Sequence, residues 1–488
     1  MLKRILVANR GEIAIRIMRA AREMGMESIA VYSEADKAAL FTKVADEKYC
    51  IGPAPASQSY LDMDKIIEVA VNVGADGIHP GYGFLAENAA FARACEKNSI
   101  KFIGPTPEAI DSMGSKIHSK NTMKKYDVPV VPGGLTNVDT EEKAFKEAER
   151  IGYPVMLKPS AGGGGKGMVV VNSEDELDKA YEKAKMIAIN SFGDDSMLVE
   201  KYLTKPRHIE FQILCDEQGN KIHVLERECS VQRRHQKLIE ETPSPVMTPE
   251  LRKEMGDAAV KAAEAIGYTN AGTVEFMYSN GDFYFLEMNT RLQVEHPITE
   301  MITRVDLAQE QLRIASGLEL QYKQKDIVGH GHSIECRINA DDPMNNMMPA
   351  PGHISQYIEP GGIEVRVDSG VYGGFTVPDC YDSLLGKLVV WGRDRTEAIN
   401  RMKRALSEYV IKGAVTNIPF HELVMNHPAF ISGDYDTNFL TQYNIMPLLK
   451  YYVERKKLLA EQHRKKLAAA TAAVEYFYKT VAKRNALE

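Results

Sequence analysis

Long apolar runs are missing from this 488-residue sequence. A membrane-spanning helix needs about twenty consecutive apolar residues, but the first apolar stretch, residues 5–8, is only four residues long. A secretory signal peptide also needs a longer apolar segment near the N-terminus. We therefore expect no membrane span, no secretion signal and a cytoplasmic location.

Cysteine is scarce, and no two cysteines form a C-x-x-C pair. In a large chain this scatter favours reduced thiols over a disulfide framework or a zinc site. We expect all six thiols to be buried for structural reasons. They are Cys50, Cys95, Cys215, Cys229, Cys336 and Cys380.

Positive charge is also in short supply, because 60 Lys and Arg face 67 Asp and Glu, for a net charge of −7. A nucleic-acid-binding protein needs a basic surface that neutralises phosphates, so nucleic acid is not an expected partner. The charge is unevenly spread. Residues 447–488 contain ten Lys and Arg and four Glu, a surplus of +6, which leaves −13 for the rest of the chain.

The same terminal segment lacks Gly, and it lacks Pro after Pro447. Its apolar residues recur at helical spacing, which predicts one or two terminal helices. The recurring residues are Leu467, Ala470, Val474, Tyr478 and Val481. A basic helix beside an acidic body suggests a docking element for another subunit; a solvated helix packed on the chain's own body is the alternative.

A chain of this length exceeds the size of one hydrophobic core, so several domains are expected. In residues 1–113 short apolar strands alternate with helices, which is typical of a parallel α/β unit. Its first turn has only Gly11 where a dinucleotide site needs G-x-G-x-x-G, which disfavours nicotinamide binding. After a second region, 114–330, strands about 363–367 and 384–391 predict a mostly β unit with a helical end at 395–409.

Four consecutive glycines stand in the segment Ser-Ala-Gly-Gly-Gly-Gly-Lys-Gly at residues 160–167. The segment fails the P-loop pattern, because Ser160 and Gly167 stand where that pattern needs Gly and Ser or Thr, and because a strand follows instead of a helix. We predict a hairpin tip whose N–H groups close over a polyphosphate, with Lys158 on the incoming strand facing a phosphate. A flexible turn without a ligand is the alternative.

Two further segments are compatible with a nucleotide but are ambiguous alone. The strand 198–203 either offers main-chain groups to an adenine edge or is an ordinary edge strand. The basic run 232–237, expected to follow a strand at 221–226, is either part of a binding site or a solvated loop.

The clearest chemical pattern begins with a hairpin, in which alternating apolar runs at 272–277 and 283–289 flank Asn280 and Gly281. In an extended chain alternate side chains share one face, so the polar residues from 287 to 295 are predicted to line up. They are Glu287, Asn289, Arg291, Gln293 and Glu295.

This polar row suggests a metal site beside an anion site. Glu275 on the neighbouring strand can join Glu287 and Asn289 as hard oxygen ligands for Mg²⁺ that bridges ATP phosphates. Arg291 then offers a planar fork for a small oxyanion, and Glu295 a carboxylate base. The alternative is an amphipathic strand whose polar side faces water.

Taken together, these segments resemble the biotin carboxylase component of biotin-dependent carboxylases, an ATP-grasp family. The resemblance runs from residue 3 to about residue 443 and includes residues 9–16, 79–88, 160–168, 232–237, 287–295 and 335–340. It implies a multidomain α/β and α+β fold: an N-terminal α/β (pre-ATP-grasp) domain at 1–113, an ATP-grasp domain at 114–330 with a mobile lid at about 130–203, a mostly β C-terminal domain at 331–446, and a helical tail at 447–488.

The resemblance also assigns roles to residues. For ATP it implies contacts from Lys116, Lys158, Gly163, Gly164, Gly165, Glu200, Lys201, Leu203, His208, Gln232 and His235. For Mg²⁺ or Mn²⁺ it implies Glu275, Glu287 and Asn289. For bicarbonate it implies Lys237, Arg291, Gln293, Val294 and Glu295, and for biotin Arg337 and Tyr82. The catalytic set is Glu295, Arg291, Arg337 and Lys237.

The implied reaction has two parts. Glu295 deprotonates bicarbonate, which attacks the γ-phosphoryl group of ATP to give carboxyphosphate and ADP. Carboxyphosphate breaks to CO₂ and phosphate, the phosphate takes the N1′ proton of biotin, and the enolate, stabilised by Arg337, attacks CO₂.

Carboxylases that carry their own biotin show Met-Lys in a setting like A-M-K-M, but here Met-Lys occurs only at 123–124 and 402–403, in neither case in that setting. The biotin is therefore expected on a separate carrier protein. The resemblance also implies a carboxyltransferase subunit as a partner and a homodimer of this chain. Pyruvate, acetyl-CoA and propionyl-CoA all remain open as the final acceptor, with a two-subunit pyruvate carboxylase favoured by the long tail. The rival functions are another ATP-grasp ligase, such as a carbamoyl-phosphate enzyme, and a non-catalytic ATP-sensing subunit.

Overall fold

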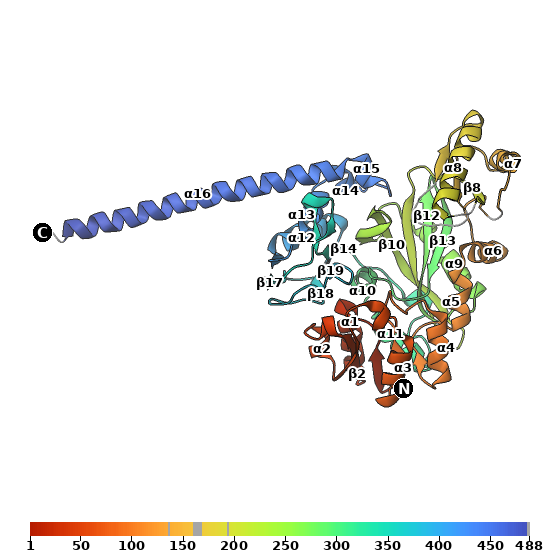
Figure 1. Cartoon of the computed structure of the whole chain (residues 1–488), viewed down its shortest axis with the longest axis horizontal. Helices are drawn as coiled ribbons and strands as arrows, with labels where there is room; N and C mark the ends of the chain where they lie inside the picture. The colour runs from red at the N-terminus through yellow and green to blue at the C-terminus, as the bar shows by residue number, and fades with distance from the viewer. Residues whose placement is uncertain (135–136, 160–167, 193–194, 486–488) are drawn as a thin grey trace.

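The computed structural model describes residues 1–134, 137–159, 168–192 and 195–485 (Figure 1). Helices and strands are mixed throughout, and a long terminal helix extends from the folded body. This confirms the predicted α/β and α+β architecture with a helical tail. The boundaries given for its four parts stay a prediction. No helix in the described residues is both long and apolar enough to cross a membrane.

The N-terminal part is a five-stranded parallel sheet in the order β3-β2-β1-β4-β5. Helices connect its strands, as the alternating pattern predicts. Gly11 begins the first helix at a φ of +64°, a conformation that glycine adopts without strain. The strands are β1 (Arg4–Val7), β2 (Glu27–Ser33), β3 (Glu47–Gly52), β4 (Gly77–His79) and β5 (Lys101–Phe102), and the main helices α1 (Gly11–Glu23), α3 (Met63–Asn72) and α4 (Ala89–Lys97).

The centre of the molecule is an eight-stranded antiparallel sheet in the order β13-β12-β9-β10-β11-β14-β19-β18. It runs without a break from strands before residue 330 to strands after it, so two of the expected regions share one sheet. Its strands are β9 (Arg207–Cys215), β10 (Lys221–Arg233), β11 (Gln236–Thr242), β12 (Asn270–Ser279), β13 (Asp282–Asn289), β14 (His332–Asn339), β18 (Val365–Ser369) and β19 (Leu384–Gly392).

Strand β10 is longer than the sequence predicts, because it continues from residue 226 to Arg233. Its pairing shifts register between His223 and Glu226 and again after Glu228, and Leu225 has a φ of +62°. Such bulges interrupt the alternation of side chains by which a strand is recognised. The basic run 232–237 is therefore the tip of the β10–β11 hairpin and not a loop that follows a short strand.

A smaller unit stands apart from the central sheet (Figure 1). It contains the antiparallel sheet β7-β6-β8, with α7 (Glu141–Ile151) and α8 (Leu177–Phe192) packed against it around a core of its own. The predicted hairpin is present as β6 (Val155–Pro159) paired with β7 (Val169–Val171), and β8 (Met197–Lys201) borders β6. The glycine tip, residues 160–167, lies outside the described residues.

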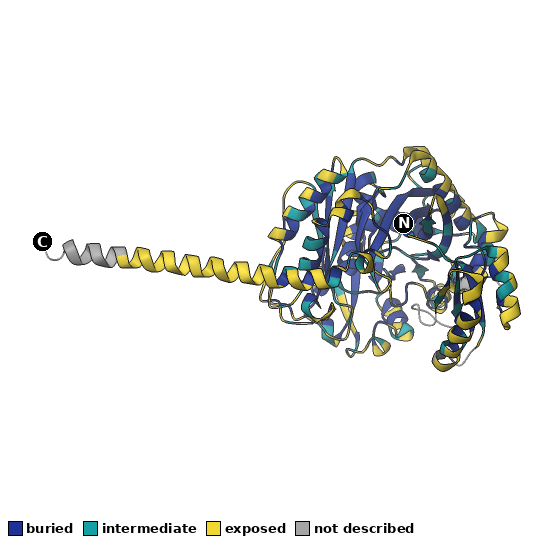
Figure 2. Ribbon diagram, turned by 90° about the horizontal axis from the view of Figure 1, so that it is seen from above, coloured by how far each residue is buried: buried dark blue, intermediate teal, exposed yellow. Residues whose placement is uncertain are grey.

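The C-terminal part adds α12 (Arg395–Glu408), α13 (Ile418–Met425) and α15 (Phe439–Gln442), which pack against interior strands of the central sheet, and it ends in one helix, α16 (Ile445–Asn485). Of the one or two terminal helices that were predicted, the described structure has one. Figure 2 shows that this helix is exposed along nearly its whole described length. Packing on the chain's own body, the alternative considered for it, is therefore wrong beyond its first turns.

The prediction of six buried thiols is wrong for two of them. All six cysteines are free, but Cys50 and Cys380 are exposed. Cys50 lies on β3, an edge strand of the first sheet, and Cys380 in the loop before β19. Neither position can be recognised from the spacing of cysteines along the chain.

Candidate active site

Three glutamates face one another across neighbouring strands of the central sheet. Glu210 on β9 is paired with Glu275 on β12, and Glu275 with Glu287 on β13; on the other side of Glu210 stands Arg227 of β10. Like charges in directly opposed positions destabilise a sheet. The row therefore requires cations, from the protein or from a bound metal.

Lys237 supplies one of these cations from β11. Its ammonium lies 2.5 Å from Glu210 Oε2, 2.9 Å from Glu275 Oε1 and 2.7 Å from Glu295 Oε1. Burial alone lowers the pKa of this amine, but the three carboxylates raise the pKa well above its ordinary value. Lys237 is thus a fixed positive charge at the centre of an acidic cluster.

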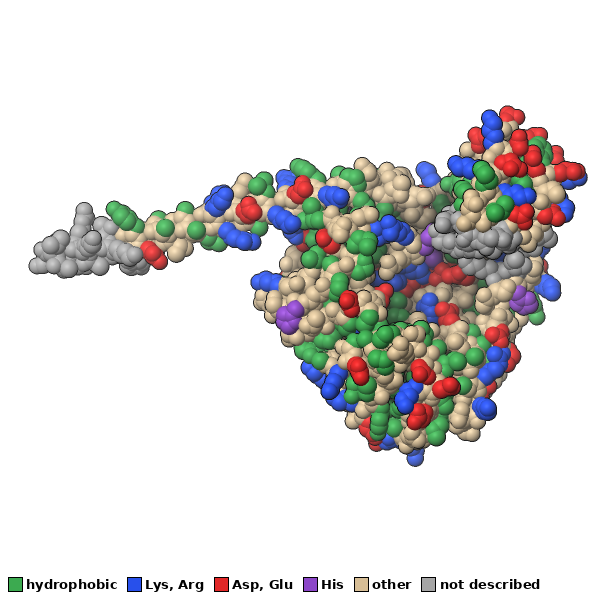
Figure 3. Space-filling view, viewed as in Figure 1, with side chains coloured by type: hydrophobic (Ala, Val, Ile, Leu, Met, Phe, Trp, Pro, Cys, Tyr) green, Lys and Arg blue, Asp and Glu red, His purple; other side chains and the backbone are tan. Residues whose placement is uncertain are grey.

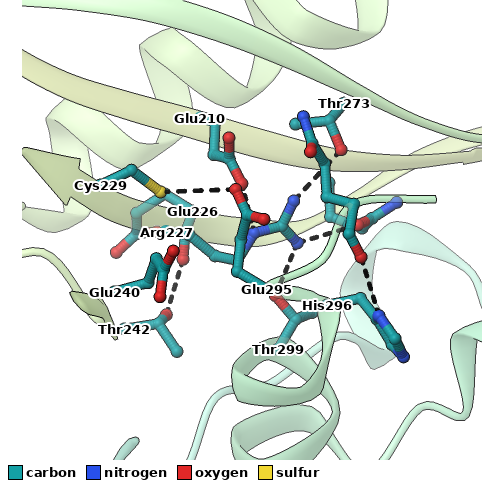
Figure 4. A network of polar contacts seen from close by, with 12 residues as sticks. Glu210, Glu226, Arg227, Cys229, Glu240, Thr242, Thr273, Glu295, His296 and Thr299 are labelled. Carbon is teal, nitrogen blue, oxygen red and sulfur yellow. Dashed lines mark hydrogen bonds and ion pairs between the residues drawn. The ribbon is translucent and has the colours of Figure 1, made fainter. Parts of the chain in front are cut away.

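Arg227 balances the same cluster from within the sheet (Figure 4). It has no exposed surface; its Nε donates to Glu210 Oε1 at 2.5 Å, and its other nitrogens donate to the side chains of Gln212, Thr273 and Thr299. All three nitrogens of the guanidinium are therefore engaged by the protein. Arg227 fixes Glu210 in place and has no fork left for a ligand.

Glu295 is held between two cations. It is fully buried, and its Oε2 accepts from Arg337 Nη2 at 2.9 Å while Oε1 accepts from Lys237. Burial acts to raise the pKa of Glu295, but Lys237, Arg337 and Arg227 bring the pKa well below its ordinary value. The side chain is an ionised acceptor just before α10 (His296–Thr303).

The expected straight row from Glu287 to Glu295 is wrong beyond Asn289. Strand β13 ends there, and residues 290–295 form a loop that leads into α10, whose first turn contains Pro297. Leu292, fully buried, anchors the loop in the core. The alternation of side chains therefore does not extend across this segment.

The polar side chains of this loop nevertheless converge. Arg291 donates from Nη2 to Asn289 Oδ1 and from Nη1 to Gln293 Oε1, both at 3.0 Å. The amides of Asn289 and Gln293 in turn donate to Glu275 Oε1, at 2.8 and 3.1 Å. Glu87 accepts from Arg291 Nε at 2.9 Å. The side chains of Asn289, Arg291 and Gln293 thus come together through hydrogen bonds, although they do not share one face of a strand.

On β8, Glu200 accepts from two lysines, Lys120 at 2.6 Å and Lys158. Lys201, in contrast, donates to the carbonyls of Gly152 and Tyr153 at 2.8 and 3.0 Å. The Lys201 ammonium thus holds β8 to the segment before β6. Glu200 binds two ammonium groups at the wall of the cleft.

His208 lies between this wall and the acidic cluster. Its Nε2 is 2.8 Å from Glu275 Oε2, and although burial acts to lower the pKa of the imidazole, Glu275 raises it above its ordinary value.

Many of these groups border one cleft of about 1720 Å³. Figure 3 shows the hollow, with acidic and basic side chains inside it. The predicted site residues that line it are Tyr82, Lys158, Glu200, Lys201, Leu203, His208, Gln232, His235, Lys237, Glu275, Glu287, Asn289, Arg291, Gln293, Val294 and Arg337. Glu295 lies directly behind Lys237 and Arg337. The side chain of Lys116 and the glycines Gly163, Gly164 and Gly165 lie outside what the structure describes.

Several residues of this centre were missed by the sequence interpretation, namely Glu87, Lys120, Glu210, Arg227 and Glu240. The sequence offered one signal for Glu210. His208, Glu210 and Gln212 stand at alternate positions, so in a strand their polar side chains share one face, and both faces of this strand, β9, are buried. Glu240 accepts from Arg337 Nε at 2.6 Å. Its place depends on the β11–β14 pairing, which the sequence does not reveal.

Comparison with known protein families identifies all three regions. Residues 1–110 match the biotin carboxylase N-terminal domain, residues 115–323 the ATP-binding domain of the carbamoyl-phosphate synthase L chain, and residues 335–442 the biotin carboxylase C-terminal domain. The chain belongs to the biotin carboxylase family. It is therefore an ATP-dependent ligase, as the resemblance implied.

Individual biotin carboxylase relatives agree over nearly the whole chain. A pyruvate carboxylase subunit of Methanothermobacter thermautotrophicus is 59% identical over 97% of this chain and 98% of its own length. Biotin carboxylase 1 of Bacillus subtilis is 53% identical over 91% of this chain and 100% of its own length. The biotin carboxylase domain of a 2-oxoglutarate carboxylase from Hydrogenobacter thermophilus, solved as a dimer with MgADP and bicarbonate, has a TM-score of 0.83 at 48% identity over 91% of this chain and 98% of that one.

Proposed function

We propose that this chain carboxylates biotin on a separate carrier protein, with ATP and bicarbonate as co-substrates, in the first half-reaction of a multisubunit carboxylase. The observation that carries the proposal is the contact of Glu295 with both Lys237 and Arg337 at the floor of the cleft. One carboxylate is thereby placed between a cation suited to bicarbonate and a cation suited to the biotin enolate.

In the first step Glu295 accepts the proton of bicarbonate. Its low pKa in the described arrangement results from Lys237 and Arg337. An incoming anion that takes over contacts with these two cations weakens their hold on Glu295, so its basicity rises when bicarbonate is bound. Lys237 and Arg291 offset the negative charge of bicarbonate, and Gln293 and the backbone at Val294 complete the site.

Glu275, Glu287 and Asn289 provide the metal site. Two directly opposed carboxylates with an amide oxygen beside them are hard ligands of the kind Mg²⁺ and Mn²⁺ prefer, and their mutual repulsion falls when a cation is bound. A metal held by these three residues would supply positive charge to the ATP phosphates. Lys158, His208, Gln232 and His235, which line the cleft, contact the phosphates, and Glu200, Lys201 and Leu203 border the base. The phosphate contacts that the resemblance implies for Lys116 and Gly163 to Gly165 lie outside what the structure describes.

Bicarbonate then displaces ADP from the γ-phosphorus, and the resulting carboxyphosphate breaks to CO₂ and phosphate. The phosphate accepts the N1′ proton of biotin, and the biotin enolate forms its new bond to CO₂. Arg337 stabilises the enolate oxygen with a guanidinium that Glu240 and Glu295 already orient. Tyr82, on the same cleft, provides a contact for the biotin ring.

The partners implied are a second copy of this chain, a biotin carrier and a carboxyltransferase subunit. Pyruvate is the favoured final acceptor, since the relative that matches 97% of the chain belongs to a pyruvate carboxylase; acetyl-CoA and propionyl-CoA are the alternatives. The free cysteines fit a reducing compartment such as the cytoplasm.

The test is ATP hydrolysis by the purified chain with and without bicarbonate and free biotin. We expect turnover that requires bicarbonate and increases with biotin. Stimulation by bicarbonate but not by biotin would point to another ATP-grasp ligase, and ATP binding without turnover to a sensor. Either result would refute the proposal.

A further inference from the structure

Helix α16 leaves the folded body after its first two turns (Figures 1 and 2). Leu449 and Val453 are buried, and Lys456 donates to Glu422 of α13 at 2.8 Å. From residue 454 to residue 476 every residue is exposed. At about 1.5 Å per residue, the helix projects tens of ångströms beyond the body.

The projecting part has the pattern of a helix that packs against something. Leu459, Leu467, Ala470 and Val474 fall on one helical face, interrupted by His463 between the two leucines, and the Leu and Val side chains among them are more than half exposed. A lone helix in water gains little stability from its own hydrogen bonds. An apolar stripe on such a helix is typical of an interface.

The charge of the projecting helix indicates which kind of partner can cover this apolar stripe. Residues 455–466 contain six Lys and Arg and one Glu. Two copies of the helix packed side by side bring these like charges together, which is unfavourable. An acidic surface on a different protein is the complementary partner.

The place where α16 begins indicates which partner protein binds to it. Met446 and Pro447, in its first turn, line the active-site cleft together with Leu440 and Thr441 of α15. A partner bound along α16 is therefore attached to a helix whose first turn borders the cleft. The partner group that must enter this cleft is biotin.

The relatives support the same assignment. Bacillus subtilis biotin carboxylase 1 aligns over its full length with 91% of this chain, whereas the Methanothermobacter protein aligns with 97%. The relative named as one subunit of a pyruvate carboxylase thus aligns over 482 residues, against 448 for the Bacillus protein.

We propose that residues 458–476 form the docking site for the biotin-bearing partner subunit, through the apolar stripe and the basic residues that flank it. This inference rests on the proposed function, because it presumes that biotin arrives on another polypeptide. Docking raises the effective concentration of biotin at the cleft without altering the catalytic groups.

The test is to express the chain with an N-terminal affinity tag in the source cells and to probe the purified complex with streptavidin for a biotinylated polypeptide. One variant ends after Lys457, which keeps the contacts of Leu449, Val453 and Lys456 with the body. A second carries Arg464→Glu, Lys465→Glu and Lys466→Glu. The matched control carries Lys97→Glu, Lys253→Glu and Lys261→Glu, the same charge change at exposed lysines on the body.

We expect the intact chain and the control to retain the biotinylated polypeptide in stoichiometric amount, and both tail variants to lose it at least tenfold. ATP hydrolysis with bicarbonate and free biotin should be equal in all four proteins, which separates a docking defect from a failure of the proposed function. Retention of the biotinylated polypeptide by the truncated chain would overturn the inference. A truncated chain that loses only a second copy of itself, seen as a halved mass by light scattering, would also overturn it.

Discussion

The Lys387 ammonium donates to the carbonyl oxygen of Val294 at 2.9 Å, and no part of the Lys387 side chain is exposed. The same ammonium lies 3.0 Å from Glu12 Oε1, and Glu12 accepts from the hydroxyl of Tyr82. A single buried cation thus connects the loop of the proposed bicarbonate site to a side chain of the proposed biotin site.

Replacing Lys387 by Met should therefore raise the KM for bicarbonate and for biotin by about tenfold, the cost of one charge-assisted hydrogen bond. The KM for ATP should change little, because no nucleotide-side residue contacts Lys387 in the described structure. Steady-state kinetics with each substrate varied in turn measure the split. The control is Arg395→Met, which breaks an ion pair with the buried Glu241 away from the cleft; equal KM changes in both variants would mean general destabilisation.

Local patterns predicted the parts of the fold that depend on neighbouring residues. Asn280 and Gly281 both have positive φ, as a tight hairpin turn requires, so the pairing of β12 with β13 followed from the turn. The β6–β7 hairpin was recognised in the same way. In both cases the information lies within about twenty residues of chain. The direct opposition of Glu275 and Glu287 did not follow from the turn, because a bulge between Glu275 and Phe276 shifts the register by one residue.

The remainder of the site depends on pairings between distant segments. Glu210 joins Glu275 only because β9 lies beside β12, and Glu240 reaches Arg337 only because β11 lies beside β14. Neither neighbour follows from the alternation of side chains within one strand. The row beyond Asn289 failed for a related reason, since tertiary anchoring of Leu292 and the start of α10 outweigh the local strand pattern.

Replacing Glu295 by Gln should abolish bicarbonate-dependent ATP hydrolysis, by about 10²- to 10⁴-fold if proton removal is its role. ATP binding, measured by calorimetry, should be unchanged. The control is Glu240→Gln, which neutralises another buried carboxylate bonded to Arg337 and should leave bicarbonate-dependent hydrolysis measurable. Turnover of the Glu295 variant at the level of the Glu240 variant would contradict the assignment of the base.

The opposed carboxylates of Glu275 and Glu287 lead to a prediction about metal. Glu287→Gln should raise the Mg²⁺ concentration needed for half-maximal ATP hydrolysis by about 10- to 100-fold, because one charged ligand is lost. The activity at saturating Mg²⁺ should recover in part. Glu250→Gln, an exposed position on α9 (Pro249–Ala265), is the control. An unchanged Mg²⁺ requirement in the Glu287 variant would exclude this residue as a ligand.

Acid should weaken the fold near Arg337 through His421. Its Nε2 lies 2.7 Å from the Arg337 carbonyl oxygen, and burial lowers the pKa of His421 from 6.5 to about 4. Between these values the unfolded chain takes up a proton and the folded chain does not, so stability is present above pH 6.5 and is lost as the pH falls toward 4.

Protonation of His421 lowers the free energy of unfolding by at most about 3 kcal/mol, since each pH unit between the two pKa values corresponds to about 1.4 kcal/mol. Urea unfolding at pH 7.5 and pH 5.5 should show that His421→Gln loses less stability on acidification than the unmodified chain, although it is less stable at pH 7.5. Asn426→Gln, at an exposed position at the end of α13 without a titratable group, should leave the pH dependence as it is. Identical pH dependence in the His421 variant and the unmodified chain would show that the His421 imidazole is not the group that responds. The loss of stability in acid would then have to arise from the other buried histidines. One of them is His79, whose pKa burial lowers to about 3.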